Sequence, residues 1–273
     1  MSNKVLKVTH NAGFFSCCSV RLFEIIKYFN ENRELPEMVD SSEQFKIHKN
    51  ENIDITNIFF SDSGEPILYT NDVIFSEVDN EPQFSDYSLI NYKQVSPFIS
   101  KYFKPSDIVN NTINRFISKY GIETDEICGV FYRGLDKHRE TNIADYDTYI
   151  NKCLDIKSKY NIRFLVQTDE SEFLKAFINV FPDSIYISEI PTMSKSDTLL
   201  AYHIPMDSRV EFGVNFLSAT IILSKCKYLV THSGNCGKWA CLFRGNNDNV
   251  YQFITAGKSA DYNNILEYNG WSK

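Results

Sequence analysis

The feature that most constrains the fold is a regular alternation of strand-like and helix-like segments in the second half of the chain. Short apolar runs are each followed by a polar turn and by a longer segment with helical periodicity. This βαβα order indicates a parallel sheet with helices on both faces. We expect strands at 127–132, 163–167, about 184–187 and 228–231, and helices at about 146–160, 171–180, 210–223 and from 233 onward.

A capped helix precedes this alternation. Ser106 follows Pro105 and stands before a helical stripe of Ile, Val and Phe that ends near Gly121. Serine is a favoured N-cap because its hydroxyl accepts a hydrogen bond from an amide of the first turn. We therefore begin a C-terminal lobe at this helix and assign it residues 105–273.

The first hundred residues open with a similar but shorter pattern. A strand-like run at 5–9 is followed by a turn at Gly13 and by a helical stripe over 20–29. Strand, glycine turn and helix are the opening of a Rossmann-like lobe. We assign residues 1–104 to this N-terminal lobe.

Much of the N-terminal lobe is irregular in sequence. The stretch 31–91 is rich in Asn, Asp, Glu, Ser and Pro, with short β-type pieces at 55–60 and 66–69. A regular sheet order cannot be traced through it. The expected fold is therefore α/β with two Rossmann-like lobes, of which the N-terminal one is reduced.

Composition excludes several classes of function. The net charge of −7 argues against a nucleic-acid partner, because binding to phosphate backbones needs a basic surface. We expect no membrane span, since no stretch approaches the roughly 20 apolar residues required. The seven Cys are scattered without zinc or redox spacing, which is typical of reduced thiols in a cytoplasmic protein.

Polar turns follow three of the expected parallel strands. In an open parallel sheet, ligands bind at the edge where the strands have their carboxyl ends. Side chains of these turns should therefore meet at one edge of the sheet. The turns span 133–140, 168–170 and 232–235.

The first of these turns carries the most informative side chains. Arg133 ends a strand, Gly134 permits a tight turn, and Asp136 and Lys137 follow at once. A guanidinium presents a planar fork of donors that suits a diphosphate. Asp136 either holds the arginine in place or caps the turn. The alternative for the whole segment is a surface turn with a structural ion pair.

The third turn, made of Ser233, Gly234 and Asn235, opens a helix. Backbone amides at a helix start, together with the helix dipole, favour an anion. The alternative is simple N-capping. His232 lies in the same turn and His10 ends the first strand, so both are positioned to line the cleft.

Residues 129–137, GVFYRGLDK, resemble the motif H-x-R-R/G-x-D of GDP-fucose-dependent fucosyltransferases of the α-1,6, nodulation-factor and α-1,2 type. Residues 168–170 are similar to the family's T-D-D/E turn, and 216–235 to its apolar helix, strand and serine turn. The pieces occur in the family's order over about 105–245. The resemblance implies a GT-B fold with two Rossmann-like lobes and a nucleotide sugar bound between them.

The resemblance also implies which residues hold the donor. Arg133 would contact the β-phosphate, and the turn at Ser233 would do likewise. Gly13 and Phe14 would face the donor or the acceptor from the first lobe, or form a tight turn that touches nothing. The residues expected in the donor site are Gly13, Phe14, Arg133, Asp136, Asp169, His232, Ser233, Gly234 and Asn235.

The sequence departs from the family at three positions. Phe131 stands where the family has a His near the nucleotide. Gly134 replaces the second Arg, as in the α-1,2 branch. The acidic residue that reads guanine in many members aligns near Ala219. Recognition of the base therefore depends on the resemblance more than on visible residues.

Glycosyl transfer needs a stabilised leaving group and commonly a base for the acceptor hydroxyl. We expect Arg133 to stabilise the departing diphosphate. Glu140 is the candidate base, with Lys137 beside it as electrostatic support. The alternative for Glu140 is an ordinary solvated carboxylate.

Asp145 and Asp147 form a D-x-D, which holds Mg²⁺ or Mn²⁺ in another class of glycosyltransferase. Here the pair begins a helix, where Asp is favoured for capping. We therefore expect no metal site, and no cofactor apart from a GDP-sugar as donor substrate.

The function predicted is metal-independent transfer of fucose from GDP-fucose to a carbohydrate hydroxyl. Two alternatives remain open: the same fold with another nucleotide sugar, or an inactive nucleotide-sugar-binding protein. An NAD-dependent oxidoreductase is disfavoured because no G-x-G-x-x-G follows the first strand. The expected partners are the nucleotide sugar and a carbohydrate acceptor.

Overall fold

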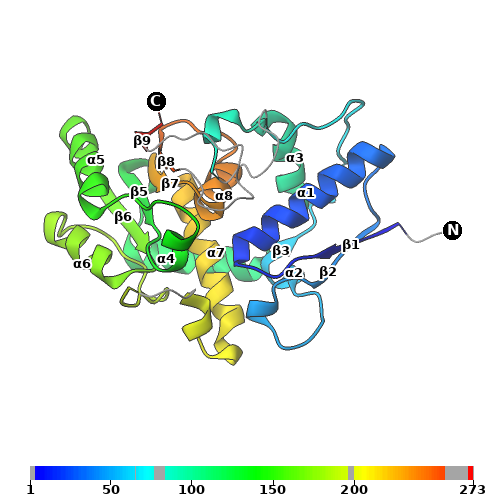
Figure 1. Cartoon of the computed structure of the whole chain (residues 1–273), viewed down its shortest axis with the longest axis horizontal. Helices are drawn as coiled ribbons and strands as arrows, with labels where there is room; N and C mark the ends of the chain where they lie inside the picture. The colour runs from blue at the N-terminus through cyan, green and yellow to red at the C-terminus, as the bar shows by residue number, and fades with distance from the viewer. Residues whose placement is uncertain (1–3, 65, 77–83, 196–199, 256–269, 273) are drawn as a thin grey trace.

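The computed structural model describes residues 4–64, 66–76, 84–195, 200–255 and 270–272. A five-stranded sheet with its helices forms one side of the molecule, and α1, β1 and β2 lie on the other (Figure 1). Helix α7, Arg209–Lys225, runs between the two sides. The two-lobed α/β arrangement expected from the sequence is thus present.

The N-terminal lobe is built on a single βαβ unit. Strand β1 (Val5–Thr9) pairs in parallel with β2 (Met38–Glu43), starting with Val5 opposite Met38. Helix α1 (Phe14–Asn32) connects them and buries one apolar face. The expected reduced Rossmann-like lobe therefore contains two paired parallel strands among the described residues.

The rest of the N-terminal half corrects the predicted β-pieces at 55–60 and 66–69. Residues Thr56–Phe59 form the short helix α2, and the Asp54 carboxylate before it accepts from the Thr56 amide at 2.8 Å. No strand covers 66–69 among the described residues: Ile67 and Tyr69 pack against the core, whereas Leu68 between them is 86% exposed.

Three further elements lead to the C-terminal lobe. Helix α3 spans Tyr92–Tyr102 and was not expected from the sequence. Strands β3 (Phe60–Ser61) and β4 (Lys104–Pro105) pair in antiparallel fashion. This small ribbon joins segments on either side of the predicted lobe boundary at 104/105, which stays a prediction.

The C-terminal lobe follows the predicted alternation closely. Its sheet has the order β6-β5-β7-β8-β9, parallel except for β9. Residues 184–187 add only an isolated bridge, Ile185 to Leu165, in place of the predicted strand. The elements are α4 (Asp107–Tyr120), β5 (Ile127–Tyr132), α5 (Tyr146–Lys159), β6 (Arg163–Thr168), α6 (Ser171–Val180), α7, β7 (Tyr228–His232), α8 (Asn235–Arg244), β8 (Val250–Ile254) and β9 (Gly270–Trp271).

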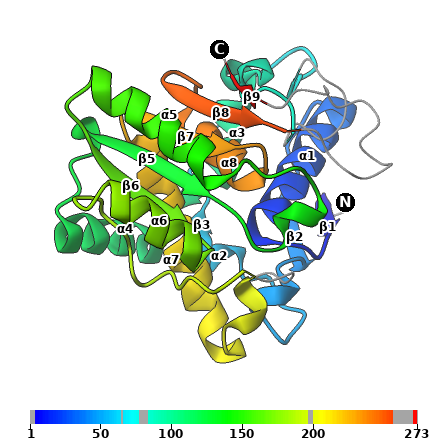
Figure 2. The same ribbon diagram turned by 60° about the vertical axis from the view of Figure 1, so that its left-hand side comes forward.

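Helices cover both faces of this sheet. Figure 2 shows α5 and α6 in front of it, whereas α7 lies behind. Helix α7 is buried around most of its circumference and approaches β5 closely at Gly129, where a Cβ would lie 2.8 Å from Leu223 Cδ2. A glycine is therefore needed there for the helix to reach the sheet.

One hydrophobic core continues from the N-terminal lobe into the C-terminal lobe. Trp239 of α8 is fully buried, and its ring lies 6.0 Å from Phe15 of α1 and 4.7 Å from Phe103. A separate core lies under α5 and α6. The contact between α1 and α8 fixes one side of the space between the lobes.

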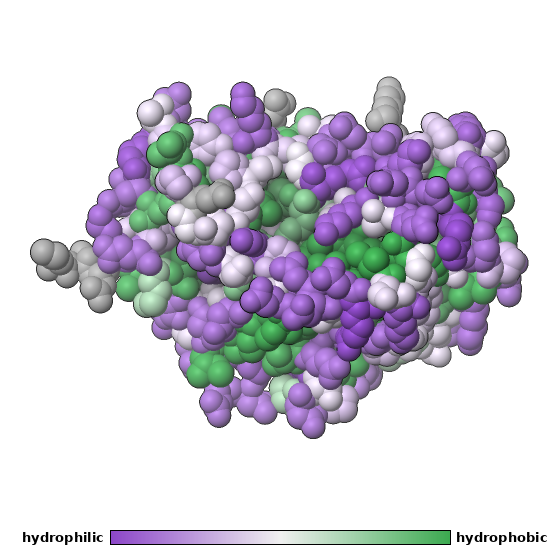
Figure 3. All heavy atoms as spheres, turned by 180° about the vertical axis from the view of Figure 1, so that it is seen from behind, coloured by the Kyte–Doolittle hydropathy of each residue, from purple (hydrophilic) through white to green (hydrophobic). Residues whose placement is uncertain are grey.

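The surface and the cysteines agree with a globular protein that holds its apolar residues inside. The rear face is mainly hydrophilic, with smaller hydrophobic areas between the polar side chains (Figure 3). All seven Cys are buried and free of disulfides. Within the described ranges, every helix is too short or too polar to cross a bilayer.

Candidate active site

A cavity lies between the lobes, at the carboxyl ends of β5 and β6. Its walls come from the start of α1, the 3-10 turn Lys46–His48, the two strand ends and α7. It contains about 740 Å³ of empty space, its open mouth included.

The wall of the cavity combines many apolar side chains with a few polar and charged ones. Phe131, Phe216 and Leu223 form part of the apolar wall. Arg133 and Asp169 line the same cavity. Concave apolar sites with a few convergent polar groups are typical of small-molecule binding.

Arg133 comes directly after β5 and is held by two carboxylates. Its Nη2 donates to Asp136 Oδ1 at 2.7 Å, and its Nε lies 3.6 Å from Asp169 Oδ2. Burial disfavours the charged guanidinium, but Asp136 and Asp169 outweigh this and raise its pKa. About a quarter of the side chain remains exposed, so a charged arginine faces the cavity in a fixed position.

Asp169 follows β6 and meets the turn after β5. Its Oδ1 accepts from the Gly134 amide at 2.9 Å. Burial raises the pKa of Asp169 to about 6, although Arg133 and the Gly134 amide work in the opposite direction. The carboxyl group therefore gains or loses its charge close to neutral pH.

Gly134 has no room for a side chain. A Cβ at this position would lie 1.5 Å from Glu170 Oε2. Glu170 is buried and accepts a hydrogen bond from the Tyr146 hydroxyl. Glu170 was not among the predicted site residues, yet it fills the space beneath the turn that carries Arg133.

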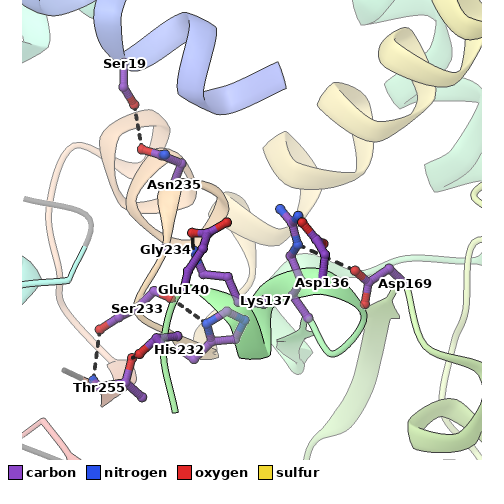
Figure 4. A network of polar contacts seen from close by, with 12 residues as sticks. Ser19, Asp136, Lys137, Glu140, Asp169, His232, Ser233, Gly234, Asn235 and Thr255 are labelled. Carbon is purple, nitrogen blue, oxygen red and sulfur yellow. Dashed lines mark hydrogen bonds and ion pairs between the residues drawn. The ribbon is translucent and has the colours of Figure 1, made fainter. Parts of the chain in front are cut away.

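Lys137 and Glu140 form a second ion pair beside the first. The Lys137 Nζ lies 2.5 Å from Glu140 Oε2. Burial lowers the pKa of Lys137. Figure 4 shows this pair next to Asp136 and Asp169, all at one side of the sheet. Glu140 is 39% exposed, so its carboxylate is open to an incoming hydroxyl.

His232 and Gly234 border Lys137. The would-be Cβ of Gly234 lies 3.4 Å from Lys137 Cε and 3.6 Å from His232 Cε1. His232 Nδ1 bonds to the Ser233 carbonyl at 2.6 Å, and Nε2 is buried without a partner among the described residues. Burial, with help from Lys137 and Arg133, lowers the pKa of His232 to about 3, so the imidazole is neutral.

Ser233 does not line the cavity, as the predicted contact with the donor phosphate would require. Its hydroxyl accepts from Gln252 Nε2 at 2.9 Å and from the Thr255 amide at 3.3 Å, and its own amide donates to the Phe253 carbonyl. The side chain is fully buried. These internal bonds occupy its donors and acceptors, so the serine supports the turn from within and does not line the cavity.

Asn235 links the two lobes. Its Oδ1 accepts from Ser19 of α1 at 2.8 Å, and the Trp239 indole donates to the same Ser19 hydroxyl at 2.9 Å. Figure 4 shows the contact between α1 and α8. The Gly234 amide donates to the Tyr87 hydroxyl at 3.0 Å. This third turn therefore borders Lys137, while Arg133 of the first turn and Thr168 and Asp169 of the second line the cavity.

The start of α1 contributes Gly13 and Phe14 to the lining of the cavity. Gly13 is the N-cap of α1 and has no side-chain capping bond, and a Cβ there would meet nothing within 4 Å. Phe14 is 4% exposed and packs against other aromatic rings. His10 does not line the cavity; its Nε2 bonds to the Ser16 hydroxyl at 2.9 Å.

Gln167 is a cavity residue that sequence reasoning missed. It lies in β6 directly opposite Phe131 of β5, and it is 3% exposed. Its amide nitrogen and carbonyl oxygen both lack a hydrogen-bond partner among the described residues. A polar residue inside an apolar strand was the only signal in the sequence.

The D-x-D is a helix cap, as predicted. Asp145 accepts from the Thr148 amide at 2.7 Å and forms the N-cap of α5. Asp147 is exposed on the first turn of that helix. Neither residue lines the cavity.

This chain is similar in fold to solved structures of NodZ fucosyltransferase. NodZ alpha-1,6-fucosyltransferase co-crystallized with GDP aligns at a TM-score of 0.52 and 12% identity, over 93% of this chain and 96% of that one. The form soaked with GDP-fucose aligns at 0.51 and 12% identity, over 98% and 100%. Fucosyltransferase NodZ from Bradyrhizobium aligns at 0.39 and 14% identity, over 59% of this chain and 49% of that one.

The first two alignments confirm the expected GT-B-like, fucosyltransferase-like α/β fold. By sequence, no known family and no curated protein matches this chain. The likeness to NodZ is therefore a likeness of fold.

Proposed function

We propose that this protein is a glycosyltransferase that transfers fucose from GDP-fucose to a carbohydrate hydroxyl without a metal ion. The observation that carries the proposal is the pair of adjacent ion pairs, Arg133 with Asp136 and Lys137 with Glu140, of which Arg133 lines a cavity between two lobes. A fold shared with a fucosyltransferase soaked with GDP-fucose supports it.

Arg133 is the residue that stabilises the leaving group. As the bond between the sugar C1 and the diphosphate oxygen breaks, negative charge grows on that oxygen. A guanidinium held in place by Asp136 and Asp169 meets this charge without reorganising. Fixed donors of this kind contribute more inside a cavity, where little water competes.

Glu140 is the residue that takes the proton. In the proposed reaction the acceptor oxygen attacks C1, its proton passes to the Glu140 carboxylate, and GDP departs. Glu140 is accessible and its position is set by Lys137. Geometry of this kind is the first requirement for a general base.

A second candidate is a protein that binds a nucleotide sugar and does not transfer it. The observation in its favour is that two carboxylates already compensate the charge of Arg133. Such a protein would bind GDP-fucose and release no GDP, with or without acceptors. The same assay, run on a panel of nucleotide sugars, tests the alternative that the protein uses a donor other than GDP-fucose.

The test compares Arg133→Ala with Arg163→Ala, an arginine on the exposed start of β6 that serves as matched control. Loss of a charge-assisted contact predicts GDP-fucose binding weaker by about tenfold or more for Arg133→Ala. The control should bind like the unmodified protein. Equal affinities for all three proteins would remove the donor role of Arg133.

Glu140→Gln separates transfer from binding. We expect GDP-fucose affinity to persist and turnover to fall by roughly 10²- to 10⁴-fold. Glu123→Gln, an exposed glutamate far from the cavity lining, is the control. Full turnover in Glu140→Gln would show that another group accepts the proton.

A further inference from the structure

We propose that Gln167 recognises the base of the bound nucleotide by pairing its carboxamide with the N1–H and O6 edge of guanine. The inference rests on the proposed function, since it needs a nucleotide in the cavity. It names the chemistry by which this chain reads the base, at a place where the sequence showed no charged residue.

The carboxamide of Gln167 is an unpaired polar group at the wall of an apolar cavity. It lines the cavity, it is 3% exposed, and neither polar atom has a hydrogen-bond partner among the described residues. Buried side-chain polar atoms are nearly always bonded in native proteins. Each unsatisfied atom destabilises the fold, because it has given up its hydrogen bonds to water without replacement. A ligand that supplies one acceptor and one donor removes that penalty.

The position of Gln167 suits a base. Gln167 is paired in register with Phe131, so both side chains project from the same face of the parallel sheet. On that face the Phe131 ring lies 6.5 Å from Phe216. Flat aromatic groups stack favourably against such rings. A heterocycle that lies against these two packed rings would turn its edge toward the carboxamide.

Arg133 is placed correctly for the rest of the nucleotide. It lies two residues beyond Phe131, and positions i and i+2 of a strand face the same side, about 7 Å apart. A base beside Phe131 and Gln167 therefore leaves the ribose and the diphosphate to extend toward the guanidinium.

The chemistry at the cavity wall favours one edge of the base. A carboxamide offers one N–H donor next to one carbonyl acceptor. Guanine presents N1–H next to O6, which matches this pair. Asp169 is the acidic side chain in the described lining, and it is already engaged by Arg133 and the Gly134 amide. No lining carboxylate is thus left to bind the guanine 2-amino group.

Binding of GDP and of inosine diphosphate measures whether the cavity recognises the 2-amino group. The two nucleotides share N1–H and O6 and differ in the 2-amino group. We expect the unmodified protein to bind both with similar affinity. Gln167→Leu should bind each at least tenfold more weakly, since two hydrogen bonds are lost. Gln167→Glu should favour GDP over inosine diphosphate, because a carboxylate accepts from both N1–H and the 2-amino group.

A stability measurement guards against a simple folding defect. Gln167→Leu removes two unsatisfied polar atoms, so the melting temperature of the ligand-free variant should equal or exceed that of the unmodified protein. The matched control is Gln252→Leu, another buried glutamine, whose carboxamide bonds to Ser85, Tyr87 and Ser233. That variant should melt at a lower temperature.

The outcomes distinguish a failure of the proposed role of Gln167 from a failure of the proposed function. Unchanged GDP affinity in Gln167→Leu, or strong preference of the unmodified protein for GDP over inosine diphosphate, would overturn the role of Gln167 and leave the proposed function standing. If the unmodified protein binds neither nucleotide, the donor assignment itself fails.

Discussion

At the scale of single residues, charge balance controls the site. Two cations, Arg133 and Lys137, face three carboxylates, Asp136, Asp169 and Glu140. With all five ionised, the cluster carries an excess of one negative charge, which opposes a diphosphate. A proton on Asp169, whose pKa is raised to about 6, removes that excess and frees one side of Arg133.

This balance predicts how donor binding depends on pH. Affinity for GDP-fucose, whose diphosphate does not titrate in this range, should rise several-fold as the pH falls from 7.5 to 5.5. Asp169→Asn should bind without that dependence, and Asp183→Asn, an exposed control, should retain it. Isothermal titration at a series of pH values measures this. A steeper dependence in Asp169→Asn would contradict the account.

The same shift affects stability with a defined sign. The folded-state pKa of Asp169 lies above its unfolded value, so the folded protein holds an extra proton between about pH 4 and 6. The stability that this proton contributes is present below pH 4 and is lost as the pH rises through 6.

Gly134 predicts a second effect at this scale. In Gly134→Ala the new Cβ would overlap Glu170 Oε2, so we expect a loss of about 1–3 kcal/mol in unfolding free energy. Gly13→Ala is the matched control, because its Cβ would enter open space at a compatible φ of −56°. Urea unfolding compares the two, and equal losses would refute the steric argument.

At the scale of elements, helix caps hold the C-terminal lobe to its surroundings. The Ser106 hydroxyl accepts from the Val109 amide at 3.3 Å and donates to the Ile58 carbonyl at 2.6 Å, so it joins α4 to α2 while buried. The Asp145 cap of α5 is exposed and local.

Removal of the two caps should lower the unfolding free energy by different amounts. Ser106→Ala should reduce the unfolding free energy by about 2 kcal/mol, because a buried carbonyl also loses its donor. Asp145→Ala should cost about 1 kcal/mol or less and leave transfer activity intact. Thermal or chemical unfolding gives both values. Loss of transfer in Asp145→Ala that Mn²⁺ restores would revive a metal role for the D-x-D.

The sequence predicted elements well where local periodicity is strong and poorly where distant contacts decide. Strand β5 and helix α6 have the predicted bounds. Helix α3 was missed because Pro97 lies inside it, and the Lys93 carbonyl that the proline leaves unpaired accepts from the Tyr69 hydroxyl at 3.0 Å. No local pattern reveals such a partner.

The site residues were likewise predictable where they are neighbours in sequence and not where distant contacts place them. Arg133, Asp136, Lys137 and Glu140 are neighbours in sequence, and the structure brings them together as two ion pairs. The interior position of Ser233 depends on Gln252 and Thr255, which follow it by some twenty residues. Long-range contacts of this kind could not be predicted from one sequence.

At the scale of the whole molecule, the two lobes share a core and enclose the cavity between them. Helices α1 and α8 meet through Ser19, Asn235 and Trp239. Helix α7 lines the cavity on the face of the sheet opposite to α5 and α6 (Figure 2). The likeness to NodZ extends over nearly the whole chain. The cavity is thus part of the overall architecture, and its occupant is the central claim.

A crystal structure of the protein with GDP tests that claim most directly. The account predicts the guanine against the wall formed by Phe131 and Phe216 with its edge toward Gln167, and the β-phosphate within hydrogen-bonding distance of Arg133. GDP bound outside this cavity, or bound in it with the phosphates away from Arg133, would contradict the account.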